Sequence, residues 1–161
     1  MGNSWRHAHG LESGLLMKVK VTLSDKALNR QIDRALKASP KEAGRAMMDC
    51  VLDLAGASAS RAPIESGDLR DNCHGIVGQT TIFQDQKPTA VPIVSMPKLI
   101  GDVGYSLPYA LRQHEDLSLR HSGPEHGDVD GGEAKFLEKP FEERTPRYIN
   151  RFARVVEDTL K

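Results

Sequence analysis

The apolar residues of this sequence change their spacing twice, which divides the chain into a helical first part, a strand-rich middle and a helical end. The first helix follows Ser24 or Asp25, either of which can accept a hydrogen bond from a helix N-terminus. Its apolar positions recur every three or four residues, at Leu28, Ile32, Ala35 and Leu36. We therefore predict a helix that buries this stripe.

A second, longer helix is predicted from Ser39 to about Arg61. Ser39 is the expected N-cap, Pro40 the first helical residue, and Glu42 completes a capping box. One face of this helix carries Ala43, Met47, Cys50, Val51, Leu54 and Ser58. Because a sulfur-containing stripe at helical spacing is far more often core than a cofactor site, we expect it to be buried.

The middle of the chain has the pattern of a β-sheet. Strands are predicted at residues 69–77, with a continuation past a bulge to 84, and at 99–105 and 109–113. Residues 85–89 resemble a turn, and Pro92 makes residues 90–94 an edge strand or an irregular segment. No crossover helix separates these strands, so the sheet is expected to be antiparallel.

The final helical segment opens at Lys139-Pro140 and keeps its apolar period to Leu160. Thr145-Pro146 can cap a fresh helix, which would leave residues 140–144 as a separate turn. The predicted fold class is therefore α+β, with an antiparallel sheet packed against N-terminal helices and a C-terminal helix.

The N-terminal residues divide into two parts. Residues 1–16 are polar and contain glycine without a clear period, which predicts a flexible extension. Residues 18–23 alternate between polar and apolar side chains, as in a half-buried strand. We therefore expect residues 17–161 to form a single domain.

Composition narrows the possible functions. The formal net charge is zero, which argues against a general nucleic-acid binder. The charge is unevenly spread: residues 62–133 carry eleven acidic and five basic side chains, a net −6. This is either ordinary surface variation or an acidic segment facing something that must not adhere, such as passing DNA. No apolar run approaches the roughly 18–20 residues that span a membrane.

Reactive side chains are few. Cys50 and Cys73 are the only cysteines and form no metal or disulfide motif, which fits a reducing cytoplasm. Phosphate-loop, nucleophile-elbow and zinc-protease motifs are absent from the sequence. The His7 and His9 pair lies in the predicted extension and is more often incidental than a ligand set. Cys73-His74 lies on a predicted strand, where neighbours point to opposite faces.

The strongest enzyme-like cluster lies in a polar, glycine-rich stretch, residues 114–132, that is predicted to be a long exposed loop. Its candidate ligands are His114, Glu115, Asp116, His121, Glu125, His126 and Asp128. Histidines and carboxylates can bind zinc or another divalent ion, but a solvated loop has the same composition. Arg61 and Arg70 are expected to pair with nearby carboxylates such as Glu65 or Asp68, or to lie at a subunit interface.

Three stretches carry a family resemblance. The first motif segment, residues 61–70, reads RAPIESGDLR; the second, residues 103–110, reads VGYSLPYA; the third, residues 134–141, reads AKFLEKPF. In this order they resemble the signature of a tailed-bacteriophage family of tail-component, tail-completion or head–tail joining proteins. The matching residues are Pro63, Gly67, Leu69, Arg70, Gly104, Tyr109, Ala110, Phe136, Leu137 and Pro140. Glu115 lies near the family's acidic residue, whereas Pro146 departs from the pattern.

The resemblance implies a structural protein in the neck of a phage or prophage, without catalytic residues, metal or cofactor. Such proteins assemble as rings, commonly hexamers, between head-completion proteins and the tail tube or tail terminator, and DNA passes through without specific binding. The implied location is the virion, after assembly in the cytoplasm of the host bacterium. A tail-terminator or head-closure ring protein is one alternative. A small metal-dependent enzyme built on the His114–His126 loop is the other.

Overall fold

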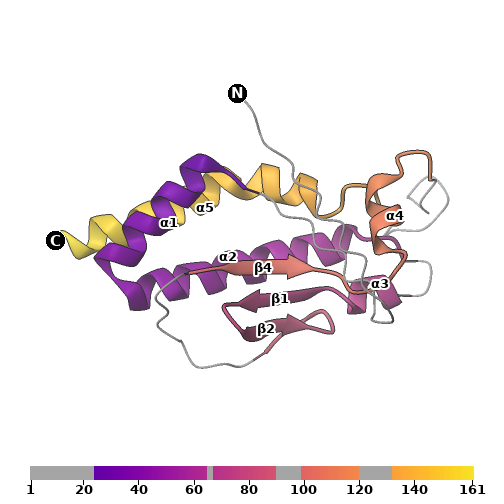
Figure 1. Ribbon diagram of the computed structural model, residues 1–161, viewed down its shortest axis with the longest axis horizontal. Helices are drawn as coiled ribbons and strands as arrows, with labels where there is room; N and C mark the ends of the chain where they lie inside the picture. Colours follow the sequence, from indigo (N-terminus) through magenta and orange to yellow (C-terminus); the bar gives the residue numbers. More distant parts are fainter. Residues whose placement is uncertain (1–23, 65–66, 90–98, 120–131) are drawn as a thin grey trace, which may run out of the picture.

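The computed structural model describes residues 24–64, 67–89, 99–119 and 132–161, and it has the predicted α+β fold (Figure 1). The helices are α1 (Lys26–Ala38), α2 (Pro40–Arg61), α3 (Asp68–Asp71), α4 (Ala110–Glu115) and α5 (Glu138–Thr159). The strands are β1 (His74–Val77), β2 (Thr80–Gln84), β3 (Lys87–Pro88) and β4 (Gly101–Gly104). The predictions for the extension, for the strand at 18–23 and for residues 90–94 lie outside the described residues.

The sheet is antiparallel, as predicted, with the strand order β3-β2-β1-β4. Asp85 and Gln86, with φ angles of 50° and 58°, make the tight turn between β2 and β3. β4 pairs with β1 over four residues, from His74 opposite Gly104 to Val77 opposite Gly101. Among the described residues no strand lies beyond β4, so β4 forms one edge of the sheet.

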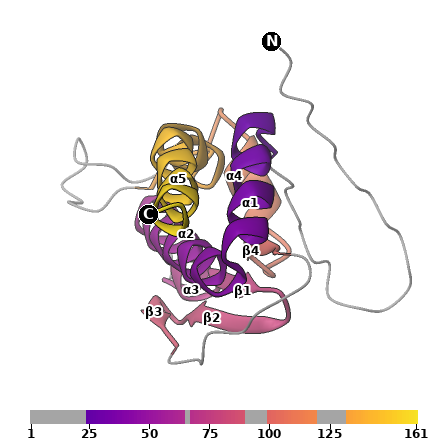
Figure 2. The same cartoon turned by 90° about the vertical axis from the view of Figure 1, so that its left-hand side faces the viewer.

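Helix α2 is the centre of the molecule. Figure 2 shows α1 and α5 side by side, with α2 between this pair and the sheet. The predicted apolar stripe of α2 is buried, and small side chains let its neighbours approach. A Cβ on Gly75 of β1 would lie 2.9 Å from Val51 Cγ1, and one on Gly101 of β4 would lie 2.6 Å from the Met47 sulfur. Glycine at these two strand positions allows α2 to lie directly on the sheet.

The first two helices start where the sequence predicts, but only one of them has the predicted side-chain capping bond. Asp25 is the N-cap of α1, and its carboxylate accepts a hydrogen bond from the Leu28 N–H at 2.8 Å. Ser39 precedes α2 and Pro40 opens it, as predicted, but the Ser39 side chain makes no capping bond. Glu42 instead pairs with Arg45 at 2.7 Å on the exposed surface. The predicted capping box is therefore wrong.

One predicted strand begins as a helix before it continues as β1, and another is helical throughout most of its length. Residues 69–71 belong to α3, because Gly67 takes a φ of 80° and its carbonyl accepts the Asp71 N–H at 3.1 Å, which starts a helical turn. Residues 110–113 form most of α4, with Tyr109 as its N-cap, and the Ala, Leu, Arg and Gln residues of this helix are strong helix formers. The predicted continuation of the first strand past a bulge is also wrong. Gly78 (φ 64°) turns the chain, and residues 80–84 return as the separate strand β2.

Helix α5 is continuous, so the predicted break at Pro146 is wrong. Proline cannot donate the usual hydrogen bond within a helix. The hydroxyl of Thr145 donates instead to the Phe141 carbonyl at 2.7 Å, next to the site of that missing bond. Tyr148, Phe152 and Val155 are buried against the core on the following turns. Packing of this apolar face therefore keeps the helix intact across the proline.

Candidate functional site

The first motif segment is the turn at which α2 ends. Pro63 follows Ala62, whose extended backbone (φ −67°, ψ 144°) stops the helix as predicted. Gly67 takes the left-handed conformation, and Leu69 then enters the core with 3% of its surface exposed. The Nε of Arg70 donates a hydrogen bond to the Ala62 carbonyl oxygen at 2.8 Å. Helix α3 is therefore tied back onto the end of α2.

Arg61 joins this turn to the segment that leads into α5. Its guanidinium contacts the Glu143 carboxylate at 2.9 and 2.6 Å and Glu133 at 3.5 Å. The Arg61 carbonyl also accepts the Glu133 N–H at 2.9 Å. These partners lie 82 and 72 residues further along the chain, whereas the sequence predicts neighbouring carboxylates. A Cβ on Gly132 would lie 2.2 Å from the Pro63 Cα, so only glycine fits where the two segments cross.

The second motif segment enters the same region from β4. A Cβ on Gly104 would lie 3.3 Å from an imidazole ring of β1. Tyr105 is buried, and its hydroxyl lies 2.7 Å from the Ser58 Oγ of α2. Ala110 is 3% exposed at the start of α4, whereas Tyr109, just before it, is 41% exposed. The segment therefore contributes one buried anchor and one surface aromatic ring.

The third motif segment is buried against the second. Phe136, Leu137 and Pro140 are all buried. The Phe136 ring packs edge-to-face on both Tyr105 and His114, with ring centres 5.0 Å apart in each pair. Such aromatic pairs add about 0.5–1.5 kcal/mol beyond the area that they bury. Phe136 thus packs the residue after β4 and the end of α4 against the segment that leads into α5.

The described residues of the three motif segments together form one end of the molecule, which we call the junction (residues 61–64, 67–70, 103–110 and 134–141). In Figure 1 it comprises the end of α2, α3, the start of α4 and the start of α5. Every matching residue except Tyr109 is buried or half-buried there, so the family-like residues act mainly in packing.

Both thiols are buried in positions unsuited to catalysis. Burial raises the pKa of Cys73 to about 11 and that of Cys50 to about 12. The Cys73 sulfur donates to the Ala55 carbonyl at 3.5 Å. A nucleophilic thiol requires a lowered pKa and access to substrate, and neither cysteine has these properties.

His114 is the centre of a polar cluster on one side of the junction. It is 3% exposed at the end of α4, not in an exposed loop as predicted. Its Nδ1 lies 2.7 Å from a Glu115 carboxylate oxygen, and its Nε2 accepts the Glu138 N–H at 3.3 Å. These bonds suit a neutral ring with its proton on Nδ1. Burial lowers the pKa of His114 and outweighs the opposing effect of Glu115.

Lys135 provides the positive charge of this cluster. Its ammonium contacts Glu115 and lies 2.9 Å from Glu138. The backbone N–H of Lys135 donates a hydrogen bond to the His114 carbonyl at 2.8 Å. Burial acts to raise the pKa of Glu115, but the hydrogen bonds from Lys135 and His114 outweigh it and lower that pKa. The Glu115 carboxylate is therefore held ionised, in part by a cation from the chain itself.

This arrangement does not suit a metal ion. His114, Glu115 and Glu138 have ligand atoms within 4.8 Å of one another, which is close enough to share an ion. The Lys135 ammonium already bridges the two carboxylates, and both ring nitrogens of His114 are hydrogen-bonded. A divalent ion would have to displace Lys135. The Asp116 carboxylate accepts hydrogen bonds from the backbone N–H and the hydroxyl of Ser118 instead. The other candidate ligands lie outside the described residues: His121, Glu125, His126 and Asp128.

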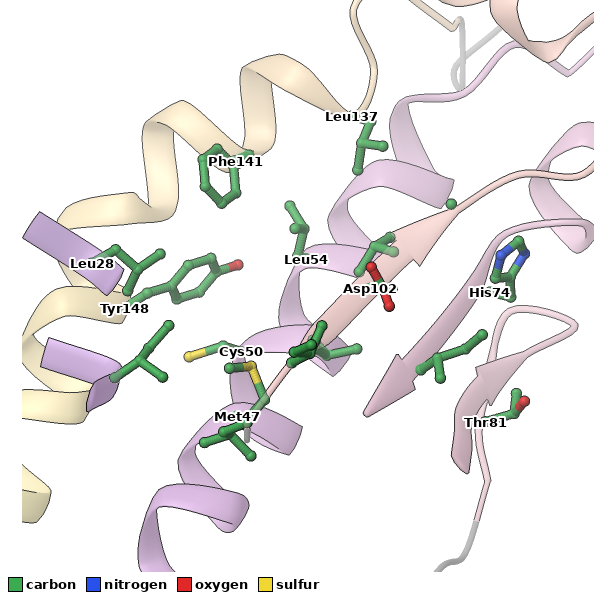
Figure 3. A pocket seen from close by; sticks show the side chains of 18 of the residues that line it. Leu28, Met47, Cys50, Leu54, His74, Thr81, Asp102, Leu137, Phe141 and Tyr148 are labelled. Carbon is green, nitrogen blue, oxygen red and sulfur yellow. The ribbon is translucent and has the colours of Figure 1, made fainter. Parts of the chain in front are cut away.

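A groove of about 1170 Å³ runs along β4 (Figure 3). Its apolar side is formed by α1, α2 and α5 and includes Leu28, Met47, Leu54, Phe141 and Tyr148. Its polar side is the outer face of the sheet and includes His74, Thr81 and Asp102. The edge of β4 separates the two sides, so the groove offers apolar surface, polar surface and strand backbone together.

Comparisons with protein-family models, with curated proteins and with solved structures gave no match. Within the described part of the chain, no helix has both the length and the apolar character that a membrane span requires. Function is therefore inferred from the residues of this chain and their geometry.

Proposed function

We propose that this chain is a structural subunit of a phage or prophage neck, which joins head to tail as part of a ring around the DNA channel. The observation that carries the proposal is the junction. Buried residues of three motif segments that are far apart in the sequence share one core there, and the Phe136 ring of the third segment packs on Tyr105 of the second. Residues that resemble one family signature thus share one structural task, which supports a common origin for the three matches.

Exposed apolar residues near the junction favour assembly with other subunits. Ile64 is 41% exposed after α2, Tyr109 is 41% exposed before α4, and Leu117 is 74% exposed after α4. In a cyclic ring each subunit buries such side chains against the next. The proposed partners are further copies of this chain, commonly six in a ring, together with head-completion proteins and the tail tube or tail terminator.

The charge of the middle segment agrees with a DNA conduit. The described residues between 67 and 119 include six carboxylates (Asp68, Asp71, Asp85, Asp102, Glu115 and Asp116) and three basic side chains (Arg70, Lys87 and Arg112). An excess of negative charge repels phosphates, so DNA could pass without being held. The role proposed here is structural and not catalytic. The subunit would act in the virion, which is assembled in the cytoplasm of the host bacterium.

The direct test is deletion of the coding sequence from the phage or prophage genome that carries it, followed by electron microscopy of induced lysates. We expect DNA-filled heads and tails that remain unjoined, and joining restored by the wild-type chain. Normal joined particles in the deletion strain would overturn the proposal.

Complementation with surface variants examines the assembly surface itself. Leu117→Lys and Tyr109→Ser should fail to restore joining while the purified variants keep wild-type helicity and melting temperature. Leu160→Ser is the matched control, because Leu160 is 83% exposed at the far end of α5. Full joining by Leu117→Lys and Tyr109→Ser would show that this surface is not the subunit contact.

A further inference from the structure

The outer edge of β4 presents backbone groups that a further strand could bind. The Gly78 N–H donates to the Ile100 carbonyl at 2.8 Å, and β4 continues in register with β1 from that pair. In an antiparallel pair, every second residue directs its N–H and C=O groups away from the partner strand. Gly101 and Val103 are those residues of β4, so their backbone groups face the groove.

The two sides of this edge differ in chemistry. Gly75 of β1 faces Val51 of α2, so its register partner Val103 lies on the same inner face of the sheet. Asp102 lies on the opposite, outer face, together with its register partner Ile76. A strand added here would therefore have an apolar groove on one side and a carboxylate on the other. Such a strand needs alternating apolar and polar residues, with basic residues among the polar ones.

The sequence directly before α1 meets this requirement. Ser24 and Asp25 line the groove and lead into α1, so the preceding residues enter the described structure at the groove. Residues 18–23 read KVKVTL. Their apolar positions are Val19, Val21 and Leu23, and their polar positions are Lys18, Lys20 and Thr22. Six extended residues span about 20 Å, which exceeds the length of the four-residue β4.

We propose that residues 18–23 bind along the outer edge of β4 as a fifth strand of the same subunit. Val19, Val21 and Leu23 enter the groove between α1, α2 and β4, and Lys18 and Lys20 lie on the side of Asp102. The added strand closes a sheet edge that would otherwise be a template for association with other chains. This inference concerns the groove alone and does not rest on the proposed neck function.

Amide hydrogen exchange of the full-length protein tests the proposal at individual residues. The Gly101 and Val103 amides should exchange at least about 100-fold more slowly than unprotected amides, because the added strand accepts their hydrogen bonds. Val21→Lys should raise both exchange rates at least tenfold, since it places an ammonium in the apolar side of the groove. Thr22→Lys is the matched control and should leave both rates within about threefold, because the same group then lies beside Asp102.

Three results would overturn the proposal. Gly101 and Val103 could exchange at the rate of unprotected amides in the wild-type protein. Val21→Lys and Thr22→Lys could have equal effects. Protection could also decrease on dilution of the wild-type protein, which would show that a second copy supplies the strand. The Ile76 amide within the sheet and the helical circular dichroism signal should stay unchanged in both variants, which separates loss of the added strand from unfolding.

Discussion

Replacement of Phe136 by alanine tests the packing of the junction most severely. Phe136 is 1% exposed and contacts the rings of Tyr105 and His114 edge-to-face. Removal of a buried phenylalanine costs about 3–5 kcal/mol, which includes both the lost transfer free energy and the cavity left behind. For a domain of this size the melting temperature changes by about 2–4 °C per kcal/mol, so we expect a decrease of about 6–20 °C.

The assay is urea unfolding followed by far-ultraviolet circular dichroism, with thermal melts as a second measurement. Phe136→Ala should lower the free energy of unfolding without a change in the denaturant slope. Leu117→Ala is the control, because this side chain is 74% exposed and its removal should alter stability by less than about 0.5 kcal/mol. A loss below about 1 kcal/mol for Phe136→Ala would refute the reasoning that this ring holds the second and third motif segments and α4 together.

Three further predictions concern single positions. Gly67→Ala should destabilise the protein by about 1–2 kcal/mol in urea unfolding, because the φ angle at this position is 80°. Gly56→Ala should stabilise it by up to about 1 kcal/mol, because a Cβ added at this helical position meets no other atom. Equal effects of the two substitutions would contradict this reasoning. Burial lowers the pKa of His114 below its usual 6.5, so the unfolded chain binds more protons and stability should fall as pH decreases through 6.5. His114→Asn should flatten this dependence in melts between pH 5 and 8, and an unchanged slope would exclude His114 as its source. Asp53→Ala should lower the free energy of unfolding by about 1–3 kcal/mol, since this half-buried carboxylate accepts hydrogen bonds from a tyrosine hydroxyl and an arginine. Asp49→Ala should lower it by less than about 1 kcal/mol, because the Asp49 side chain is 60% exposed in its ion pair. The reverse order in urea titrations would contradict this assignment.

The long elements were predictable because they bury one continuous face. The stripe from Leu28 to Leu36 and the longer stripe of α2 have the helical period over several turns. Helices α3 and α4 span only 4 and 6 residues, too few for a period to identify them. A turn at Gly67 and the backbone conformation of Tyr109 start them. The break predicted at Pro146 was wrong for a different reason, since packing of α5 on the core outweighs the hydrogen bond that proline lacks.

The local backbone roles of residues in the candidate site were predictable from the sequence, but the contacts between distant segments were not. Pro63 and Gly67 have local backbone roles that follow from their chemistry. The pairing of Arg61 with Glu143 joins residues 82 positions apart, and no local pattern indicates it. His114 looked like part of an exposed polar loop because Lys135 and Phe136, which enclose it, lie on the far side of that loop in the sequence. Burial that depends on such distant contacts is not visible in a local composition.

The central claim, that this chain is a ring-forming subunit, is tested most directly by the mass of the purified full-length protein in solution. Light scattering should be measured across a concentration series from micromolar to about millimolar. The chain has a mass of 17.7 kDa, so a six-membered ring would have six times this value, about 106 kDa. A discrete mass of that order, or a monomer that shifts toward it as concentration rises, is the predicted result. A mass of 17.7 kDa at every concentration would contradict self-assembly of the subunit.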